Sequence, residues 1–93
     1  MHTTLNEVRQ AIDSLDQQLI ELLAQRQCLV EQAGRLKPKN DAQAVAAPDR
    51  VAQMITNRRQ QAAAANLSPD VAEAVWRAMI EAFIRLETEV NCH

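Results

Sequence analysis

Arg26 and Lys37 are the residues of this sequence whose type and spacing first suggest chemistry. Arg26 lies in the stretch I-E-L-L-A-Q-R-Q-C-L-V, at a position where the helical repeat of apolar residues calls for an apolar side chain. Burying an unpaired charge costs several kcal/mol, so this guanidinium needs an acidic partner or an anionic ligand. Lys37 follows three helical turns later, rotated by about 20° and roughly 16 Å further along the axis. Two cations on one side of a helix suggest an anionic ligand.

Both cations, and one carboxylate, also have explanations that involve no ligand. Arg26 could pair with Glu21 or Glu31 at the edge of the apolar face. Lys37 could lie at a helix C-terminus simply because a cation is favoured there. Glu87 interrupts the apolar face near the C-terminus of the chain, where it is either half-solvated or buried in its protonated form.

Two further arginines could join such a site from a distance. Arg9 precedes Arg26 by seventeen residues, about 100° around an ideal helix, so the two cannot easily share one pocket within a chain. If two copies pair their long helices antiparallel across a two-fold axis, Arg9 of one copy could complete the site of the other. A loop could bring in Arg50. The pair Arg58 and Arg59 is interpreted instead as the solvated face of a helix.

A long helix must hold most of these cations. Thr3 or Thr4 can cap it, and the predicted range is about 4–37, where Pro38 ends it. At 1.5 Å per residue this helix is roughly 50 Å long, more than the width of a small domain. It must therefore pack against something beyond its own chain.

Two shorter helices follow a loop. Residues 38–47 are predicted as a loop because they contain Asn, Asp, small residues and proline. The second helix, 48–66, starts with a proline in its first turn. The third helix, 69–91, has Ser68 as its N-cap, followed by Pro69 and an acid in the first turn.

The composition favours an all-α fold in a single domain, residues 1–93. Only Trp76 and Phe83 are aromatic, and the chain has one Gly and three Pro. This is typical of helical proteins, because Gly and Pro interrupt helices and sheets are richer in aromatic residues. A chain this short has little core of its own, so self-association is expected.

Charge and cysteine content exclude several classes of function. The net charge of −2 supplies no broad cationic surface for nucleic acid. No apolar stretch approaches the roughly 20 residues of a membrane span, so a cytoplasmic protein is expected. Cys28 and Cys92 are too far apart to suggest a zinc site, and Cys28 is expected to be a small buried residue. No metal site is predicted.

The ordered set of motifs resembles the all-helical chorismate mutases, together with the related isochorismate-pyruvate lyase. The match covers essentially the whole chain, from V-R-Q-A-I-D through L-L-A-Q-R and G-R-L-K to A-P-D-R-V and W-R-A-M-I-E-A-F-I-R-L-E. The resemblance implies three helices in an intertwined homodimer, whose long first helices pair and whose two equivalent sites take residues from both chains. It also implies a small dicarboxylate substrate, chorismate or isochorismate, and no cofactor.

The resemblance further implies a role for each charged residue. Arg26 and the partner subunit's Arg9 look like the clamps for two substrate carboxylates. Lys37 looks like the cation at the ether oxygen, and Arg50 like the cation that closes the pocket from the loop side. Glu87 matches a position that is Gln in many members and Glu in some, facing the ether oxygen from the other side. An ionised Glu there would repel the growing charge, so an acid-leaning pH-rate profile that flattens in Glu87→Gln is expected.

Three residues raise the question of specificity. Ala47 and Val51 stand where typical mutases have acidic or polar residues for the ring hydroxyl, and Phe83 replaces a small hydroxyl residue. The lyase looks similar in having an aromatic there and in the stretch A-A-P-D-R-V.

The prediction is a chorismate mutase of aromatic amino acid biosynthesis, giving prephenate. One alternative is an isochorismate-pyruvate lyase that gives salicylate and pyruvate. Another is a non-catalytic helical dimerisation or regulatory module, in which Arg26 is merely paired with an acid.

Overall fold

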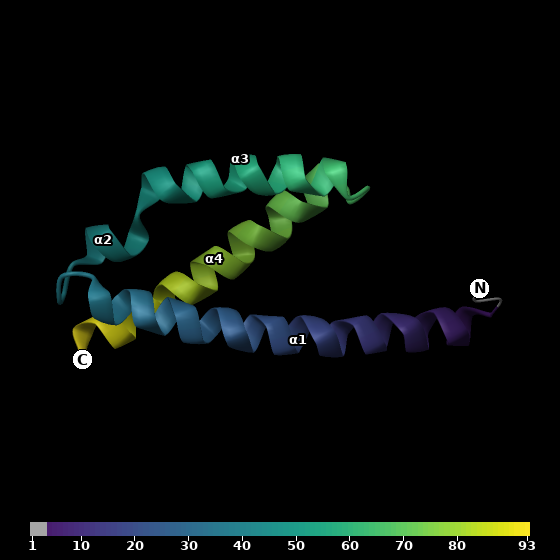
Figure 1. Cartoon of the computed structure of the whole chain (residues 1–93), viewed down its shortest axis with the longest axis horizontal. Helices are drawn as coiled ribbons and strands as arrows, with labels where there is room; N and C mark the ends of the chain where they lie inside the picture. Colours follow the sequence, from purple (N-terminus) through teal and green to yellow (C-terminus); the bar gives the residue numbers. More distant parts are fainter. Residues whose placement is uncertain (1–3) are drawn as a thin grey trace.

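The computed structural model describes residues 4–93, which form α-helices and no β-strand (Figure 1). The all-α prediction is therefore confirmed for this part of the chain, whereas Thr3 lies outside the described residues. The segment 38–47, predicted as a loop, contains a helix of five residues. The helices in chain order are α1 (Leu5–Leu36), α2 (Ala42–Ala46), α3 (Pro48–Ala64) and α4 (Pro69–Cys92).

Short side chains and prolines define where the helices begin. The side chains of Thr4, Asp41 and Ser68 each accept a hydrogen bond from the backbone N–H three residues further on, at 3.1, 3.0 and 3.3 Å. These contacts satisfy N–H groups that have no partner within the helix. Pro48 and Pro69 occupy the first turns of α3 and α4, where the missing N–H costs nothing.

α4 is the central helix and packs against each of the other three (Figure 1). It crosses obliquely between α3 and the C-terminal half of α1. Gly34 permits the close approach of α1, because a Cβ atom there would lie only 3.0 Å from Cγ of Glu87. The apolar residues that one chain buries are few, and they lie at these helix contacts: Val45, Ile55, Ala62, Ala72 and Ile80.

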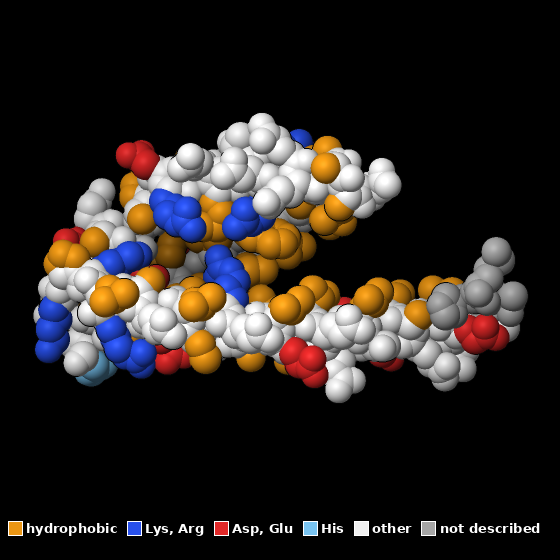
Figure 2. All heavy atoms as spheres, viewed as in Figure 1, with side chains coloured by type: hydrophobic (Ala, Val, Ile, Leu, Met, Phe, Trp, Pro, Cys, Tyr) orange, Lys and Arg blue, Asp and Glu red, His pale blue; other side chains and the backbone are white. Residues whose placement is uncertain are grey.

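The N-terminal half of α1 extends away from the other helices with its apolar residues uncovered. Ile12, Leu15 and Leu19 are 50, 58 and 54% exposed, and Figure 2 shows hydrophobic side chains along this edge of the helix. The radius of gyration is 16.2 Å, against about 12 Å for a compact domain of this length. The uncovered row is consistent with pairing of two copies, and the intertwined homodimer stays a prediction.

The prediction that Cys28 is buried is wrong, because this residue is exposed. It lies about 200° around α1 from Arg26, on the side of the helix that faces away from α3 and α4. Within residues 4–93, no helix is long and apolar enough to cross a membrane. The same residues contain no group of three or more His, Cys, Asp or Glu side chains that could hold a metal ion.

Candidate functional site

A cleft of about 400 Å³ lies between α1, α3 and α4, with α2 at its edge. Its volume falls in the range of small-molecule sites in proteins. Figure 2 shows Lys and Arg side chains gathered at the hollow between α1 and α3. The lining includes the cations Arg26, Lys37, Arg50 and Arg58 and a single carboxylate, that of Glu87. This excess of positive charge favours an anionic ligand.

Arg26 is half-buried in this cleft with part of its hydrogen-bonding capacity unused. Its Nη1 is buried and has no hydrogen-bond partner among residues 4–93. The guanidinium lies over the Phe83 ring at 4.8 Å, and Nη2 lies 4.0 Å from Sδ of Met54, a weak acceptor. Burial lowers the pKa of Arg26 from its ordinary value, and the charges of Arg58 and Arg50 lower it further. Arginine stays protonated nonetheless. A ligand carboxylate here would therefore offset both the free-energy cost of burying the guanidinium and its repulsion from Arg58 and Arg50.

The acidic partners considered for Arg26 do not pair with it. Glu31 instead lies 3.6 Å from Arg35, on the outer side of α1, and accepts a hydrogen bond from Gln27. No ion pair joins Arg26 to Glu21 in the part of the chain that the structure describes. The explanation of Arg26 as half of an ion pair with either residue is therefore wrong.

Lys37 and Glu87 form an ion pair within the cleft. Lys37 Nζ donates to Glu87 Oε2 at 2.7 Å, and the Glu87 side chain is only 9% exposed. The pair joins the C-cap of α1 to α4, so Lys37 does more than complement the end of its own helix. An ammonium group has three N–H donors, and two of them remain for a ligand.

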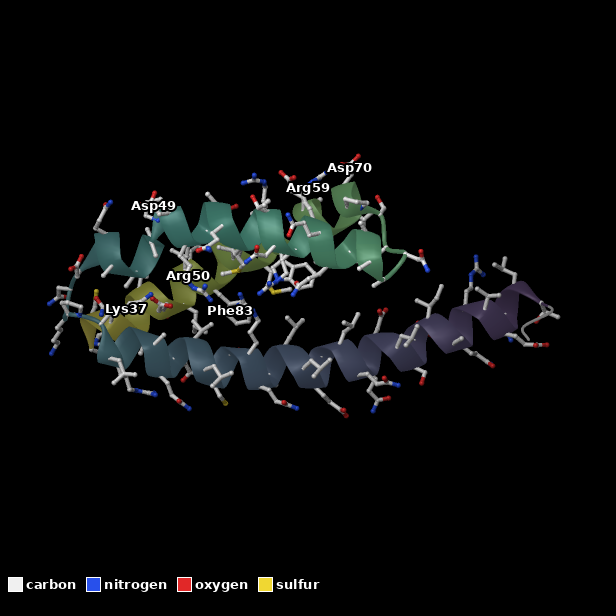
Figure 3. The ribbon with its side chains drawn as sticks, turned by 45° about the horizontal axis from the view of Figure 1, so that its top comes forward. Lys37, Asp49, Arg50, Arg59, Asp70 and Phe83 are labelled. Carbon is white, nitrogen blue, oxygen red and sulfur yellow. The ribbon has the colours of Figure 1, made fainter. Side chains whose placement is uncertain are left out.

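Arg58 was expected on a solvated face, and the structure places it on the face of α3 that borders the cleft. Arg58 is half-buried, lines the cleft and lies over the Trp76 ring at 5.7 Å. Its neighbour Arg59 points outward instead, pairing with Asp70 at 3.1 Å and with Glu73 at 2.9 Å (Figure 3). Adjacent helical residues differ by about 100° in direction, which separates the two arginines.

A signal for Arg58 was present in the sequence of α3. Arg50, Met54 and Arg58 are spaced four residues apart, which places all three on one face of the helix. Each of them lines the cleft. Once Arg50 is a candidate, this spacing makes Arg58 a candidate as well.

The remaining predicted residues of the cleft come from α3 and α4. Figure 3 shows Arg50 and Phe83 on the sides of their helices that face the cleft, whereas Asp49 lies on the outer side. Ala47 and Val51 add apolar lining where α2 meets α3. This end of the cleft therefore offers no polar side chain from either position.

Arg9 is the predicted site residue that one chain does not bring to the cleft. It is exposed, and seventeen residues separate it from Arg26, about 25 Å along the helix axis. The six other predicted residues line one cleft: Arg26, Lys37, Arg50, Val51, Phe83 and Glu87.

Several known proteins are similar to this chain in sequence. The T-protein of Haemophilus influenzae is 41% identical over 73 residues, 78% of this chain and 19% of the relative. The T-protein of Enterobacter agglomerans is 38% identical over 77 residues, 83% of this chain and 20% of the relative. The isochorismate pyruvate lyase of Pseudomonas aeruginosa is 32% identical over 82 residues, 88% of this chain and 79% of the relative. The chain thus spans about a fifth of the length of the two T-proteins.

The family comparison includes all the cleft residues discussed above. A family model described as chorismate mutase type II matches residues 8–88. That range begins just before Arg9 and includes Glu87. The chain therefore belongs to the chorismate mutase type II family.

Proposed function

We propose that this chain is a chorismate mutase, which rearranges chorismate to prephenate in aromatic amino acid biosynthesis. The observation that carries the proposal is the unpaired, buried Nη1 of Arg26 in a cleft lined by three further cations. A buried donor without a partner is costly, and a substrate carboxylate would satisfy it. Membership of the chorismate mutase type II family supports the same choice of substrate.

The cleft contains groups suited to this reaction, in which a C–O bond breaks while a C–C bond forms. The step needs neither a nucleophile nor a proton transfer. Catalysis instead comes from holding the dianion in a folded, reactive conformer and from stabilising negative charge on the ether oxygen. Arg26 can bind one carboxylate with two parallel hydrogen bonds, which Lys could not do. The two remaining N–H groups of Lys37 can reach the ether oxygen, with Glu87 fixing the direction of the ammonium group.

The second carboxylate clamp is proposed to come from another copy of the chain. Arg9 is exposed on the half of α1 whose apolar row is left uncovered by the rest of residues 4–93. In an antiparallel pairing of two α1 helices across a two-fold axis, the start of one helix lies beside the later part of the other. The partner subunit's Arg9 would then reach the cleft, and Arg50 would close it from the loop side.

Isochorismate-pyruvate lyase activity is the second candidate. Ala47 and Val51 give one end of the cleft an apolar lining, and Phe83 lies under the Arg26 guanidinium. Isochorismate carries its ring hydroxyl at a different ring position from chorismate. It would therefore lose no hydrogen bond at that apolar end. The similarity to an isochorismate pyruvate lyase over most of both chains adds support. A non-catalytic module is the third candidate, and the absence of an acidic partner for Arg26 in residues 4–93 speaks against it.

The decisive experiment offers the purified protein chorismate and isochorismate in parallel, at pH 5 and 7.5. Loss of each substrate and appearance of prephenate, salicylate and pyruvate are followed together. Prephenate as the main product supports the mutase, whereas salicylate with pyruvate supports the lyase. Inactivity on both substrates, with no rise in melting temperature on adding a bicyclic transition-state analogue, would move the assignment to the non-catalytic module.

Two variants make this experiment specific to the cleft. Arg26→Ala removes the carboxylate clamp and should abolish most of the rate as well as the shift in melting temperature. Arg35→Ala is the matched control, because Arg35 is an exposed arginine of the same helix that pairs only weakly with Glu31. The control should keep both the rate and the shift.

A further inference from the structure

Asn91 is a buried polar residue that connects α4 to the end of α1 and to the loop beyond it. It is 4% exposed and lies one turn after Glu87 on the same face of α4. Its Nδ2 donates to the carbonyl oxygen of Gly34 at 2.9 Å and to that of Pro38 at 3.0 Å. Its Oδ1 accepts a hydrogen bond from the backbone N–H of Asp41 at 2.9 Å. Both ends of the amide are therefore engaged.

These hydrogen bonds replace what the end of α1 cannot provide for itself. In a continuing helix the Gly34 carbonyl would accept from the N–H of residue 38, but Pro38 has no N–H. A buried carbonyl without a donor is costly, and the Asn91 amide supplies the donor. Because Gly34 and Pro38 lie on either side of Lys37, one side chain fixes the backbone both before and after the lysine.

The same amide also connects to α2. The Asp41 N–H bonds to Asn91, while the Asp41 carboxylate caps α2 through the N–H of Ala44. α2 places the buried Val45 against the cleft. Asn91 thus attaches the segment from Lys37 to Val45 to α4, in addition to the Lys37–Glu87 pair.

We propose that Asn91 is a positioning residue, which holds the end of α1 so that Lys37 stays against Glu87 in the cleft. The catalytic consequence rests on the proposed function of Lys37 at the ether oxygen. Lys37 Nζ has a short contact of 2.7 Å with Glu87, and its backbone is held by the Asn91 bonds on both sides. A displacement of about 1 Å in such a group can cost up to about 100-fold in rate.

The test uses the whole 93-residue chain with two variants of Asn91 and one control. Asn91→Ala removes the three side-chain hydrogen bonds. It leaves the bond that the Asn91 backbone carbonyl accepts from the N–H of Asn40 at 3.4 Å. Asn91→Asp keeps an acceptor for the Asp41 N–H and turns a carboxylate towards the two carbonyl oxygens, so it provides a second variant if the alanine protein does not fold. Ile55→Val is the control, because Ile55 is buried in α3, does not line the cleft, and loses a single methyl group.

The first readout is amide hydrogen exchange, which does not depend on activity. Exchange should become faster in residues 37–46 of both Asn91 variants, while α3 stays protected as in the wild type. Ile55→Val should not change exchange in that segment. Uniformly faster exchange in all helices would mean that Asn91 acts on global stability alone, and unchanged exchange would mean that the bonds do not hold the segment. Either result would overturn the proposal.

The second readout separates kcat from KM on whichever substrate is turned over, well below each variant's melting temperature. We expect kcat to fall about 10- to 100-fold in the Asn91 variants, with little change in KM, since Arg26 and Arg50 still bind the substrate. Unchanged kcat together with faster local exchange would show that Lys37 does not depend on Asn91, and would also overturn the proposal. If the wild type turns over neither substrate, the proposed function fails, and the exchange pattern alone decides whether Asn91 holds the segment around Lys37.

Discussion

Lys37 Nζ and Glu87 Oε2 lie 2.7 Å apart, although fifty residues separate them in the chain. The carboxylate is the more buried partner, with its side chain 9% exposed against 28% for the lysine. An anion at this distance offsets part of the positive charge that Lys37 presents to the cleft. The same carboxylate orients the ammonium group of Lys37. Glu87 therefore favours stabilisation of charge on an ether oxygen by orienting the lysine, and opposes it by its own negative charge.

The substitution Glu87→Gln tests this balance. Gln removes the negative charge and can still accept a hydrogen bond from Lys37 while donating one to an oxygen that gains charge. We expect kcat at pH 7.5 to be higher in Glu87→Gln than in the wild type, because the variant presents a donor instead of a negative charge to that oxygen. Equal kcat values in the two proteins would remove Glu87 from the rate-determining step.

Arg58 and Arg59 form a matched pair for testing the role of charge in the cleft. Arg58 lines the cleft, and its charge is one of those that lower the pKa of Arg26. Arg58→Gln should raise KM roughly 10- to 100-fold, because a charge-assisted hydrogen bond contributes about 1.5–3 kcal/mol. Arg59→Gln should leave KM unchanged and lower only the melting temperature, because Arg59 pairs with Asp70 and Glu73 outside the cleft. Equal KM values in the two variants would contradict a binding role for Arg58.

The residues that break an apolar pattern were the ones that could be found from the sequence. Arg26 is conspicuous because it interrupts a regular helical repeat, and the structure places it in a cleft without an acidic partner among residues 4–93. The helix starts at Pro48 and Ser68 depend on local side chains, and such signals can be recognised within a few residues of sequence.

The contacts between helices could not be found in the same way. The Lys37 to Glu87 pair depends on how α4 crosses α1, which local patterns do not specify. Arg58 was assigned to a solvated face because α3 alone does not show which of its faces borders the cleft. α2 has no repeat to detect in five residues, and it forms because Asp41 caps it and Val45 is buried.

Glu73 should make the fold sensitive to acid. The hydrogen bond from Arg77, together with that from Arg59, lowers the pKa of Glu73 below its ordinary value of 4.5. A carboxylate with a lowered pKa in the folded state stabilises the protein above the pKa of the unfolded chain, and this contribution disappears as pH falls through the folded-state pKa. The melting temperature of the wild type should therefore fall more steeply between pH 5 and 3 than that of Glu73→Gln. The control Glu81→Gln removes a carboxylate that is 76% exposed and 3.5 Å from Arg85, and should follow the wild type.

The uncovered apolar row of α1 predicts the oligomeric state. Wild-type protein should sediment at twice the 10.4 kDa mass of the chain, because exposed apolar residues such as Ile12 and Leu15 gain from mutual burial. Ile12→Glu places a charge in this row and should give a monomer with a lower melting temperature. Gln17→Glu adds the same charge on the opposite side of α1, about 140° from Ile12 and about 160° from Leu15, and should stay dimeric. A wild-type monomer at micromolar concentration would contradict the paired arrangement.

Mixing two inactive variants tests whether Arg9 completes the site of the partner subunit. Arg9→Ala and Arg26→Ala should each lose most activity in a pure dimer. After subunit exchange in an equal mixture, about half of the dimers are mixed, and each of these has one site with both native arginines. Activity should therefore return to about a quarter of the wild-type value.

The control for that experiment mixes Arg26→Ala with Lys37→Ala. Arg26 and Lys37 line the cleft of the same chain, so a mixed dimer has one defect in each cleft and no intact site. This mixture should recover no activity. If Arg9→Ala with Arg26→Ala also fails to recover, although mixed dimers are detected by mass spectrometry, Arg9 does not act across the dimer, because complementation requires the two arginines to meet from different chains.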